Sequence, residues 1–333
     1  MKLPWLIAGL LALSTAAQAQ TLDSVKRAGE LRCGVEAGLT GFSQVDSKGQ
    51  WSGLDVDICR AVAAVALGDP AKVKFVALTP QTRFTALQSG EIDLLTFDTT
   101  WTLSRETTGG LLFAGVDFYD GQGFMVHADG VDSAKKLDGA TICLQPGTVT
   151  ELNISDFQRL NHIKLQPVLI ESLPQALSAF QTGRCDAYTA DASALAGIRA
   201  TLQKPESVRI LPDIISKEPL GPSVRSNDSR WFNLVRWTLI AMIAAEEFGV
   251  TKGNVDAMLK SDNPDIQRLL GVGTAFGESM GVTNDWAVKV IRAVGNYGES
   301  FDRNMGSGSL LGLPRGLNAQ WKNGGLMYAP PVR

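Results

Sequence analysis

Short apolar runs alternate with amphipathic segments along the first third of the chain. The apolar runs over 31–35, 73–77 and 92–97 have the length of buried strands, and apolar residues recur at helical spacing between them. The two helices begin after Gly53 and at Thr79-Pro80, since threonine is a common N-cap and proline fits the first helical position. This order of strands and helices predicts a parallel sheet with right-handed crossovers.

The same alternation returns further along the chain and predicts a second α/β unit. Its strands are expected over 141–144, 165–170 and 185–189. Two other segments, 119–126 and 218–224, are interpreted as crossings between the units, which would allow two lobes to bend about a hinge. The helices expected after Trp231 return to the first unit.

One passage occurs almost twice. Residues 86–98 read ALQSGEIDLLTFD and residues 179–191 read AFQTGRCDAYTAD. Each copy is typical of a helix end, a glycine stop and a short strand that finishes on a carboxylate, Asp98 or Asp191. Two such units, each presenting the carboxyl end of a strand, predict two lobes that face one another across a ligand cleft.

The N-terminus predicts export. Lys2 precedes an apolar run over 6–13 and then Ala17-Gln18-Ala19, a small-x-small cleavage site. This pattern is typical of a secretory signal peptide and is too short for a membrane-spanning helix. The most apolar later stretch, 234–245, is interrupted by Arg236, so we expect a soluble exported protein.

The charge balance argues against two classes of partner. The formal net charge is −3, and removal of Lys2 leaves 30 of the 31 basic residues against 34 acidic ones, or −4. Mild acidity without a basic run disfavours nucleic acid and electrostatic docking to a membrane.

The four cysteines are Cys33, Cys59, Cys143 and Cys185. An oxidising compartment favours disulfides, and of the three full pairings one bridge per lobe, Cys33–Cys59 and Cys143–Cys185, fits the repeat best. The alternative is four free buried thiols. A zinc site is not expected, because the chain has no Cys-x-x-Cys and both histidines, His127 and His162, are isolated.

Several polar residues at predicted strand ends suit an α-amino acid. Arg105 follows the strand that ends at Asp98, and its planar guanidinium can donate two parallel hydrogen bonds to a carboxylate; the alternative is a solvated helix arginine. Asp191 supplies a carboxylate suited to an ammonium. Thr148 and Glu151 have the spacing of a capping box, so Thr148 is expected to be the N-cap of a helix whose first N–H groups could bind an anion, although ordinary capping explains the same pattern.

Catalytic and cofactor motifs are missing from the sequence. It contains no Gly-x-Ser-x-Gly elbow, no Walker sequence and no Ser/His/Asp set that can be placed. The segment 271–273 lacks the third glycine of a dinucleotide loop. We therefore expect no metal and no cofactor.

The chain resembles the periplasmic solute-binding proteins of polar amino-acid ABC transporters, and most closely the general L-amino-acid-binding proteins. The resemblance covers essentially the whole mature chain. It rests on the stretches GLDVDICRAVAAV, RFTALQSGEIDLL, TTWTLSRET, FAGVDFYDGQGFMV, ISKEPLGPSVR, AEEFGVT, SDNP, GVTNDWAVKVI, VGNYGE and YAPPVR.

The resemblance implies the type II periplasmic binding protein fold, an α/β fold of two lobes joined by two crossover strands. The signal peptide would be residues 1–19, cleaved after Ala19; lobe 1 would be 20–124 plus 225–333, and lobe 2 would be 125–224. The implied function is capture of an L-amino acid in the periplasm by lobe closure, followed by delivery to a membrane permease. A monomer without cofactor is expected.

The resemblance also implies roles for individual residues. Arg105 would hold the α-carboxylate of the ligand, with a further donor from Thr100. Asp191 would accept the α-ammonium, and the loop from Leu39 to Phe42 would form a wall of the side-chain pocket.

Two positions depart from the pattern of close relatives. Phe97-Asp98 stands where they read Arg-Asn, so Asp98 and Asp191 would both face a ligand that carries one α-ammonium. Unless Asp98 is turned away or protonated, this disfavours acidic side chains, and we expect neutral or basic ligands. Val149 stands where relatives have a threonine; the backbone N–H groups of Thr148 and Val149 would still bind the carboxylate, but valine has no hydroxyl to add to them.

An enzyme on the same fold is the alternative function. A dehydratase acting on a small carboxylate would need an acid or base beside the ligand, and Glu36 and Asp98 are the evident candidates. A sensor domain would normally belong to a longer chain with a membrane span.

Overall fold

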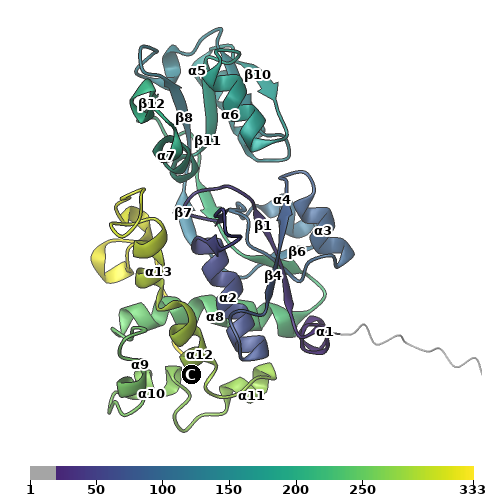
Figure 1. Ribbon diagram of the computed structural model, residues 1–333, viewed down its shortest axis with the longest axis vertical. Coiled ribbons are helices and arrows are strands. Elements are labelled where there is room, and N and C mark those ends of the chain that lie inside the picture. The colour runs from purple at the N-terminus through teal and green to yellow at the C-terminus, as the bar shows by residue number, and fades with distance from the viewer. Residues whose placement is uncertain (1–19) are drawn as a thin grey trace, which may run out of the picture.

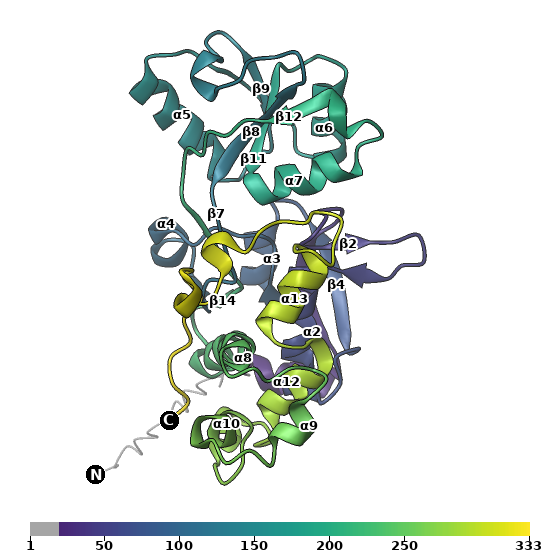
Figure 2. The same ribbon diagram turned by 90° about the vertical axis from the view of Figure 1, so that its left-hand side faces the viewer.

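The computed structural model describes residues 20–333, so the predicted signal peptide lies outside the described residues. Two five-stranded sheets, one in each half of an elongated molecule, form the framework of two lobes (Figures 1 and 2). Within the described range, none of the helices combines the length and the hydropathy that crossing a membrane requires.

The first sheet has the strand order β4-β1-β5-β14-β6. Its strands are β1 (Leu31–Glu36), β4 (Val73–Leu78), β5 (Leu94–Leu95), β6 (Leu111–Phe113) and β14 (Ser223–Arg225). Strand β1 pairs in parallel with β4 and with β5, as the alternation of strands and helices predicted. Strand β14 is antiparallel to both of its neighbours.

The second sheet has the same plan, in the order β10-β9-β11-β8-β12. Its strands are β8 (Gln122–His127), β9 (Thr141–Leu144), β10 (Gln166–Leu169), β11 (Ala187–Asp191) and β12 (Val208–Ile210). Three strands are parallel and β8 is antiparallel to both neighbours. The predicted fold class, two α/β lobes, is therefore confirmed.

Both predicted crossings between the lobes are present. Strands β7 (Phe118–Asp120) and β13 (Glu218–Leu220) pair antiparallel, with Asp120 opposite Glu218. Each crossover then continues into the other lobe, as β8 or as β14. Gly121 and Gly221 stand at these passages, where a Cβ atom would overlap Ile214 or the Gly115 carbonyl. Strands β8 and β14 begin within three residues of the predicted lobe boundaries, which themselves stay a prediction.

Helices cover both faces of each sheet, and most of them belong to the first lobe (Figure 1). The first lobe carries α1 (Thr21–Ala28), α2 (Leu54–Leu67), α3 (Arg83–Ser89), α4 (Leu103–Thr107), α8 (Ser229–Glu247), α9 (Val255–Met258), α10 (Pro264–Leu269), α11 (Phe276–Met280), α12 (Trp286–Val294) and α13 (Tyr297–Asn304). The second lobe carries α5 (Thr150–Asn161), α6 (Leu173–Gln181) and α7 (Ala192–Thr201). Helix α2 is buried on nearly all sides because α1, α8 and α12 pack around it.

The remaining elements are short. They are the hairpin β2 (Gln44–Val45) and β3 (Trp51–Ser52) and the 3-10 turns η1 (Ala134–Lys136), η2 (Pro205–Ser207), η3 (Gly316–Asn318) and η4 (Trp321–Asn323). The chain after Trp231 returns to the first lobe as predicted, and its last part, beyond α13, follows the surface of that lobe (Figure 2).

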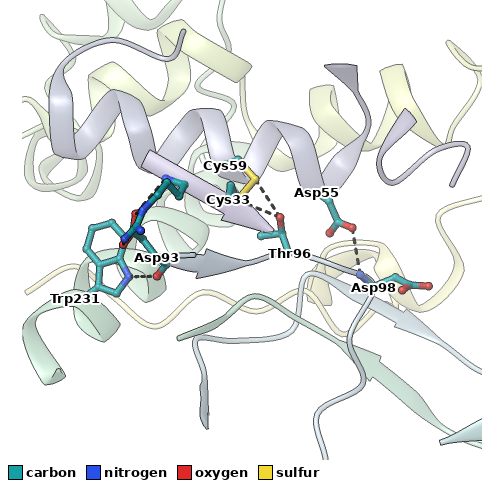
Figure 3. Close-up of a disulfide and its surroundings, with 8 residues drawn as sticks. Cys33, Asp55, Cys59, Asp93, Thr96, Asp98 and Trp231 are labelled. Carbon is teal, nitrogen blue, oxygen red and sulfur yellow. Dashed lines mark hydrogen bonds and ion pairs between the residues drawn. A yellow bond between two sulfur atoms is a disulfide. The ribbon is translucent and has the colours of Figure 1, made fainter. Parts of the chain in front are cut away.

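Each lobe contains one disulfide, and the predicted pairing is confirmed. Cys33–Cys59 joins β1 to α2, and Cys143–Cys185 joins β9 to the segment that leads into β11. The Thr96 hydroxyl lies 3.0 Å from the Cys59 sulfur, between β5 and the first bridge (Figure 3).

The near-duplicated passage performs the same structural task in both lobes. The Asp93 carboxylate accepts a hydrogen bond from the Arg32 N–H (3.1 Å), while the Asp93 N–H donates to the Arg32 carbonyl (2.8 Å). Asp186 repeats both contacts with Thr141, at 2.7 and 2.9 Å. The repeated aspartate therefore fixes the turn after α3 to β1 in the first lobe and the turn after α6 to β9 in the second.

Removing the second disulfide by Cys143→Ala with Cys185→Ala should lower the free energy of unfolding by about 3–4 kcal/mol, because the loop that it closes spans 42 residues of sequence. Urea denaturation under oxidising conditions measures the change. A decrease below about 1 kcal/mol would contradict a stabilising role for this bridge.

Candidate ligand-binding site

A cavity lies between the two lobes, where strand ends of both sheets meet. Its lining includes the predicted ligand residues except Phe42: Leu39, Asp98, Thr100 and Arg105 from the first lobe, and Thr148, Val149 and Asp191 from the second. Glu36, Arg83, Gln145 and Tyr188 line it as well. Residues from distant parts of the sequence thus surround one small space, as expected for a cleft between facing strand ends.

Phe42 lies outside this cavity. Its side chain is 1% exposed, and its ring packs edge-on against Phe118 with centroids 5.4 Å apart. The loop turns back on itself, since the Phe42 N–H bonds to the Leu39 carbonyl (3.1 Å). Leu39 therefore reaches the cavity while Phe42 packs in the core of the first lobe.

Arg105 is held in place by its own helix. The N-cap of α4 is Thr102, whose hydroxyl accepts a hydrogen bond from the Arg105 N–H (3.3 Å). The Arg105 Nη1 donates to the Thr100 carbonyl (2.6 Å), and the Arg105 guanidinium lies 5.0 Å from the ring centroid of Phe84. Burial and the neighbouring Arg83 lower the pKa of Arg105 to about 9, so the side chain is still charged at neutral pH.

Asp98 occupies an unusual backbone conformation. Its φ of 38° is in the left-handed region, which aspartate tolerates better than most residues but at some cost in energy. The Asp98 N–H donates to the Asp55 carboxylate (3.1 Å), and the Asp98 carboxylate points away from Asp55 (Figure 3). Burial, together with Glu36 and Asp191, raises the pKa of Asp98 well above its ordinary value.

Asp191 ends β11 directly before α7. Although it stands at the N-cap position, its side chain makes no capping hydrogen bond among residues 20–333. Burial raises the pKa of Asp191 well above its ordinary value, and the nearby carboxylates of Asp120 and Glu218 add to the effect. A cationic group placed beside Asp191 would stabilise the ionised carboxylate and lower its pKa.

Arg83 was not singled out by the sequence, although it lines the cavity. Its side chain is 3% exposed and lies between Phe84 and Phe97, 4.8 and 4.9 Å from their centroids. Its two terminal nitrogens are 3.4 Å from the Phe97 carbonyl of the first lobe and 3.4 Å from the Gly147 carbonyl of the second. Burial lowers the pKa of Arg83, opposed by Asp98, Glu36 and Asp191.

A second contact joins the lobes beside Arg83. The Gln145 amide of the second lobe donates to the Glu36 carboxylate of the first lobe at 3.4 Å. Glu36 is 7% exposed, and burial raises its pKa. The sequence had named Glu36 only as a candidate acid or base; its position at the end of β1 follows the same strand-end rule that indicated Asp98 and Asp191, so this signal could have placed it in the cavity.

The predicted capping box at Thr148 is wrong. Helix α5 begins at Thr150, with Val149 at its N-cap position. Gly147, with φ of 80°, turns the chain so that the Thr148 hydroxyl donates to the Gln145 carbonyl (3.0 Å) and does not reach the helix. Thr148, Val149 and Thr150 all line the cavity from this turn.

Formal charges in the cavity do not balance. Glu36, Asp98 and Asp191 carry three negative charges when ionised, whereas Arg83 and Arg105 carry two positive ones. Burial is the main cause that raises the pKa of each of the three carboxyl groups, and neighbouring carboxylates add to it for Asp98 and Asp191. When all three groups are ionised, the cavity carries one net negative charge and favours an additional positive charge.

Residues 31–252 match the family described as bacterial extracellular solute-binding proteins, family 3. A general L-amino acid-binding periplasmic protein of Rhizobium johnstonii is 54% identical over 96% of this chain and 95% of its own length. A glutamate/glutamine/aspartate/asparagine-binding protein of Rhodobacter capsulatus is also 54% identical, over 96% of this chain and 95% of its own.

Among solved structures, a periplasmic binding protein from Brucella ovis with glutathione bound is 55% identical. Its TM-score is 0.93, and the match covers 95% of this chain and all of the Brucella chain.

The buried Asp55 generates a prediction on pH. Burial raises the pKa of Asp55 to about 7, whereas an unfolded aspartate has a pKa near 3.9. The folded state therefore holds this proton more tightly, and its stability should fall as pH rises from about 4 to about 7. Asp55→Asn retains an acceptor for the Asp98 N–H and should remove part of this decline, about 4 kcal/mol at most.

Urea denaturation of the wild type and of Asp55→Asn between pH 4 and pH 8 measures the difference in slope. The exposed Asp129→Asn serves as the matched control and should follow the wild type. Parallel curves for the wild type and Asp55→Asn would show that ionisation of Asp55 does not limit stability.

Proposed function

The chain belongs to family 3 of the bacterial extracellular solute-binding proteins, and we propose on this basis that it is the periplasmic binding component of an amino-acid ABC transporter. It captures an L-amino acid between its lobes and delivers it to the membrane permease. The observation that carries the proposal is that Arg105 of one lobe and Asp191 of the other line the same cavity. These opposite charges match the α-carboxylate and α-ammonium that every L-amino acid carries.

The placement of the site residues supports the role proposed for each of them. Arg105 binds the α-carboxylate, helped by Thr100 and by the backbone N–H groups of Thr148 and Val149. Asp191 accepts the α-ammonium and gains the positive charge that its buried position favours. Leu39 contacts the ligand side chain from the first lobe.

The ligand side chain is neutral or basic in this proposal. When Glu36 and Asp98 are ionised, a zwitterion bound to Arg105 and Asp191 leaves their two negative charges around the single positive charge of Arg83, a net charge of −1. A cationic side chain balances this excess, and a neutral side chain leaves it unchanged. A second carboxylate increases the repulsion, so glutamate and aspartate are disfavoured.

Lobe closure couples binding to transport. Arg83–Gly147 and Glu36–Gln145 are contacts between the lobes, so they form only when the lobes come together. A ligand that bridges Arg105 and Asp191 stabilises the same arrangement and shifts the population toward the closed form. The permease then recognises a closed monomer.

The periplasm is the proposed location, with the signal peptide cleaved after Ala19. The two disulfides support an oxidising compartment, because such bridges are rare in the reducing cytosol.

The proposed specificity predicts an order of affinities. Titration calorimetry with L-arginine, L-histidine, L-glutamine, L-glutamate and glutathione should give weaker binding for glutamate than for the first three. Asp98→Asn removes the negative charge that Asp98 carries when ionised and should improve glutamate affinity about tenfold. Tightest binding of glutamate by the wild type would contradict the proposed ligand class.

The enzyme alternative is tested in the same samples. Mass spectrometry after incubation should recover each bound compound unchanged. Conversion of any of them would favour a dehydratase-like activity with Glu36 or Asp98 as the acid or base.

Removal of Arg105 tests the placement of the site. Arg105→Ala leaves the ligand carboxylate without its buried partner and should weaken amino-acid binding at least about 30-fold. Arg184→Ala, an exposed arginine of the second lobe, is the matched control and should bind like the wild type. Intact binding by Arg105→Ala would show that the ligand lies elsewhere.

A further inference from the structure

The chain beyond residue 252 lies outside the family match and packs on the first lobe. After α13 it runs along that lobe and passes the crossover strand β7, where its last part is the yellow ribbon in Figure 2. The contacts of this segment with β7 are specific, and they involve the hinge rather than the cavity.

Asn318 completes the outer edge of β7. Its side-chain oxygen accepts a hydrogen bond from the Tyr119 N–H (2.7 Å), and its side-chain nitrogen donates to the Tyr119 carbonyl (3.1 Å). Strand β13 lies on the other side of β7, with Pro219 opposite Tyr119. The Asn318 side chain, which is 4% exposed, thus makes the two hydrogen bonds that a neighbouring strand would otherwise make to Tyr119.

Two further contacts hold Asn318 to the body of the first lobe. Arg315 donates from Nε and Nη2 to the Asn318 carbonyl (3.0 and 2.7 Å) and forms a bidentate ion pair with Glu246 of α8 (2.9 and 3.0 Å). On the other side of Asn318, the buried Gln320 donates to the Ile243 carbonyl of α8 (3.0 Å). We call Arg315, Asn318 and Gln320 the C-terminal clamp.

The residue after Tyr119 contacts the second lobe. The Asp120 carboxylate accepts hydrogen bonds from the backbone N–H (3.2 Å) and the hydroxyl of Ser193, two residues beyond Asp191. The Ala192 N–H donates to the Gly121 carbonyl (2.9 Å). Strand β7 is therefore fixed to the first lobe at Tyr119 and to the start of α7 at Asp120, with the passage between the lobes immediately after it.

The other crossover is held differently. The Trp101 N–H donates to the Pro219 carbonyl (2.7 Å) and the Gly221 N–H donates to the Thr99 carbonyl (3.1 Å), so β13 is attached to the segment that precedes α4. Of the two crossover strands, β7 is the one whose backbone is hydrogen-bonded by the C-terminal segment.

We propose that the C-terminal clamp positions β7 for lobe closure and that Asn318 is a positioning residue for ligand affinity; this rests on the proposed function. With the clamp in place, closure rotates the second lobe about a crossover that is already ordered against the first lobe. Without it, the Tyr119 backbone groups turn to water, β7 samples other positions, and a smaller fraction of the protein is competent to close.

The test compares three variants of the complete mature protein. Asn318→Ala removes both hydrogen bonds to Tyr119. Asn318→Asp keeps the acceptor for the Tyr119 N–H and removes the donor to its carbonyl. Asn323→Ala, an exposed asparagine of the same tail, is the matched control. Titration calorimetry with L-glutamine and with L-arginine measures affinity, amide hydrogen exchange at Tyr119 measures the clamp, and urea denaturation verifies folding.

Asn318→Ala should accelerate Tyr119 exchange and weaken the binding of both amino acids by the same factor, about 5–10-fold, because Asn318 acts on closure and does not touch the ligand. Asn318→Asp should fall between Asn318→Ala and the wild type, and Asn323→Ala should match the wild type. Equal affinities of the wild type and Asn318→Ala, a weakening confined to one amino acid, or unchanged Tyr119 exchange would each overturn the proposal.

The outcome is distinguishable from failure of the proposed function. A wild type that binds no amino acid in the panel would contradict that function. The Tyr119 exchange rates of the folded variants would then decide on the clamp by themselves.

Discussion

Charged side chains buried between the two lobes govern the design of this protein. Taking an ion out of water is costly unless an opposite charge or several hydrogen bonds replace the solvent. The first lobe contributes both arginines of the cavity, and the second contributes Asp191 and backbone carbonyls. The first lobe also contributes Glu36 and Asp98, so Asp191 is the charge that the second lobe adds without a cationic partner of its own. In the proposed complex, a zwitterion between the lobes supplies that partner to Asp191 and a carboxylate to Arg105.

The internal repeat separates residues that maintain the fold from those that have diverged. Asp93 and Asp186 retain the same pair of backbone contacts in both lobes. Thr96 and Thr189 are identical in type but not in environment: the Thr96 hydroxyl lies against a disulfide, and the Thr189 hydroxyl donates to a carbonyl of β8. The repeated aspartates thus keep the same backbone partners in both lobes, whereas the repeated threonines have different partners although the residue type is the same.

The sequence was sufficient for the architecture, because strand and helix periods, glycine stops and the offset of the repeat are local signals. It also indicated Asp98, Arg105 and Asp191, since strand ends of parallel sheets converge. It could not identify Arg83, whose role depends on a carbonyl 64 residues away in the other lobe. The capping box at Thr148 was wrong because the turn at Gly147 redirects a side chain that the linear pattern assigned to the helix. Phe42, which the resemblance placed in the pocket wall, packs in the core because its loop turns back on itself.

The chain leaves the first lobe through β7 and returns to it through β13, and this path affects the order in which the two sheets can form. The second sheet is built from one continuous stretch, from Gln122 to Ile210, whereas the first sheet lacks the interior strand β14 until Ser223–Arg225 is available. During synthesis from the N-terminus, the chain can therefore complete the second sheet while the first sheet still lacks β14 between β5 and β6. The first lobe has the larger sequence separation to close, and long-range pairing of this kind is slow. The lobe that begins first during synthesis is thus the one completed last.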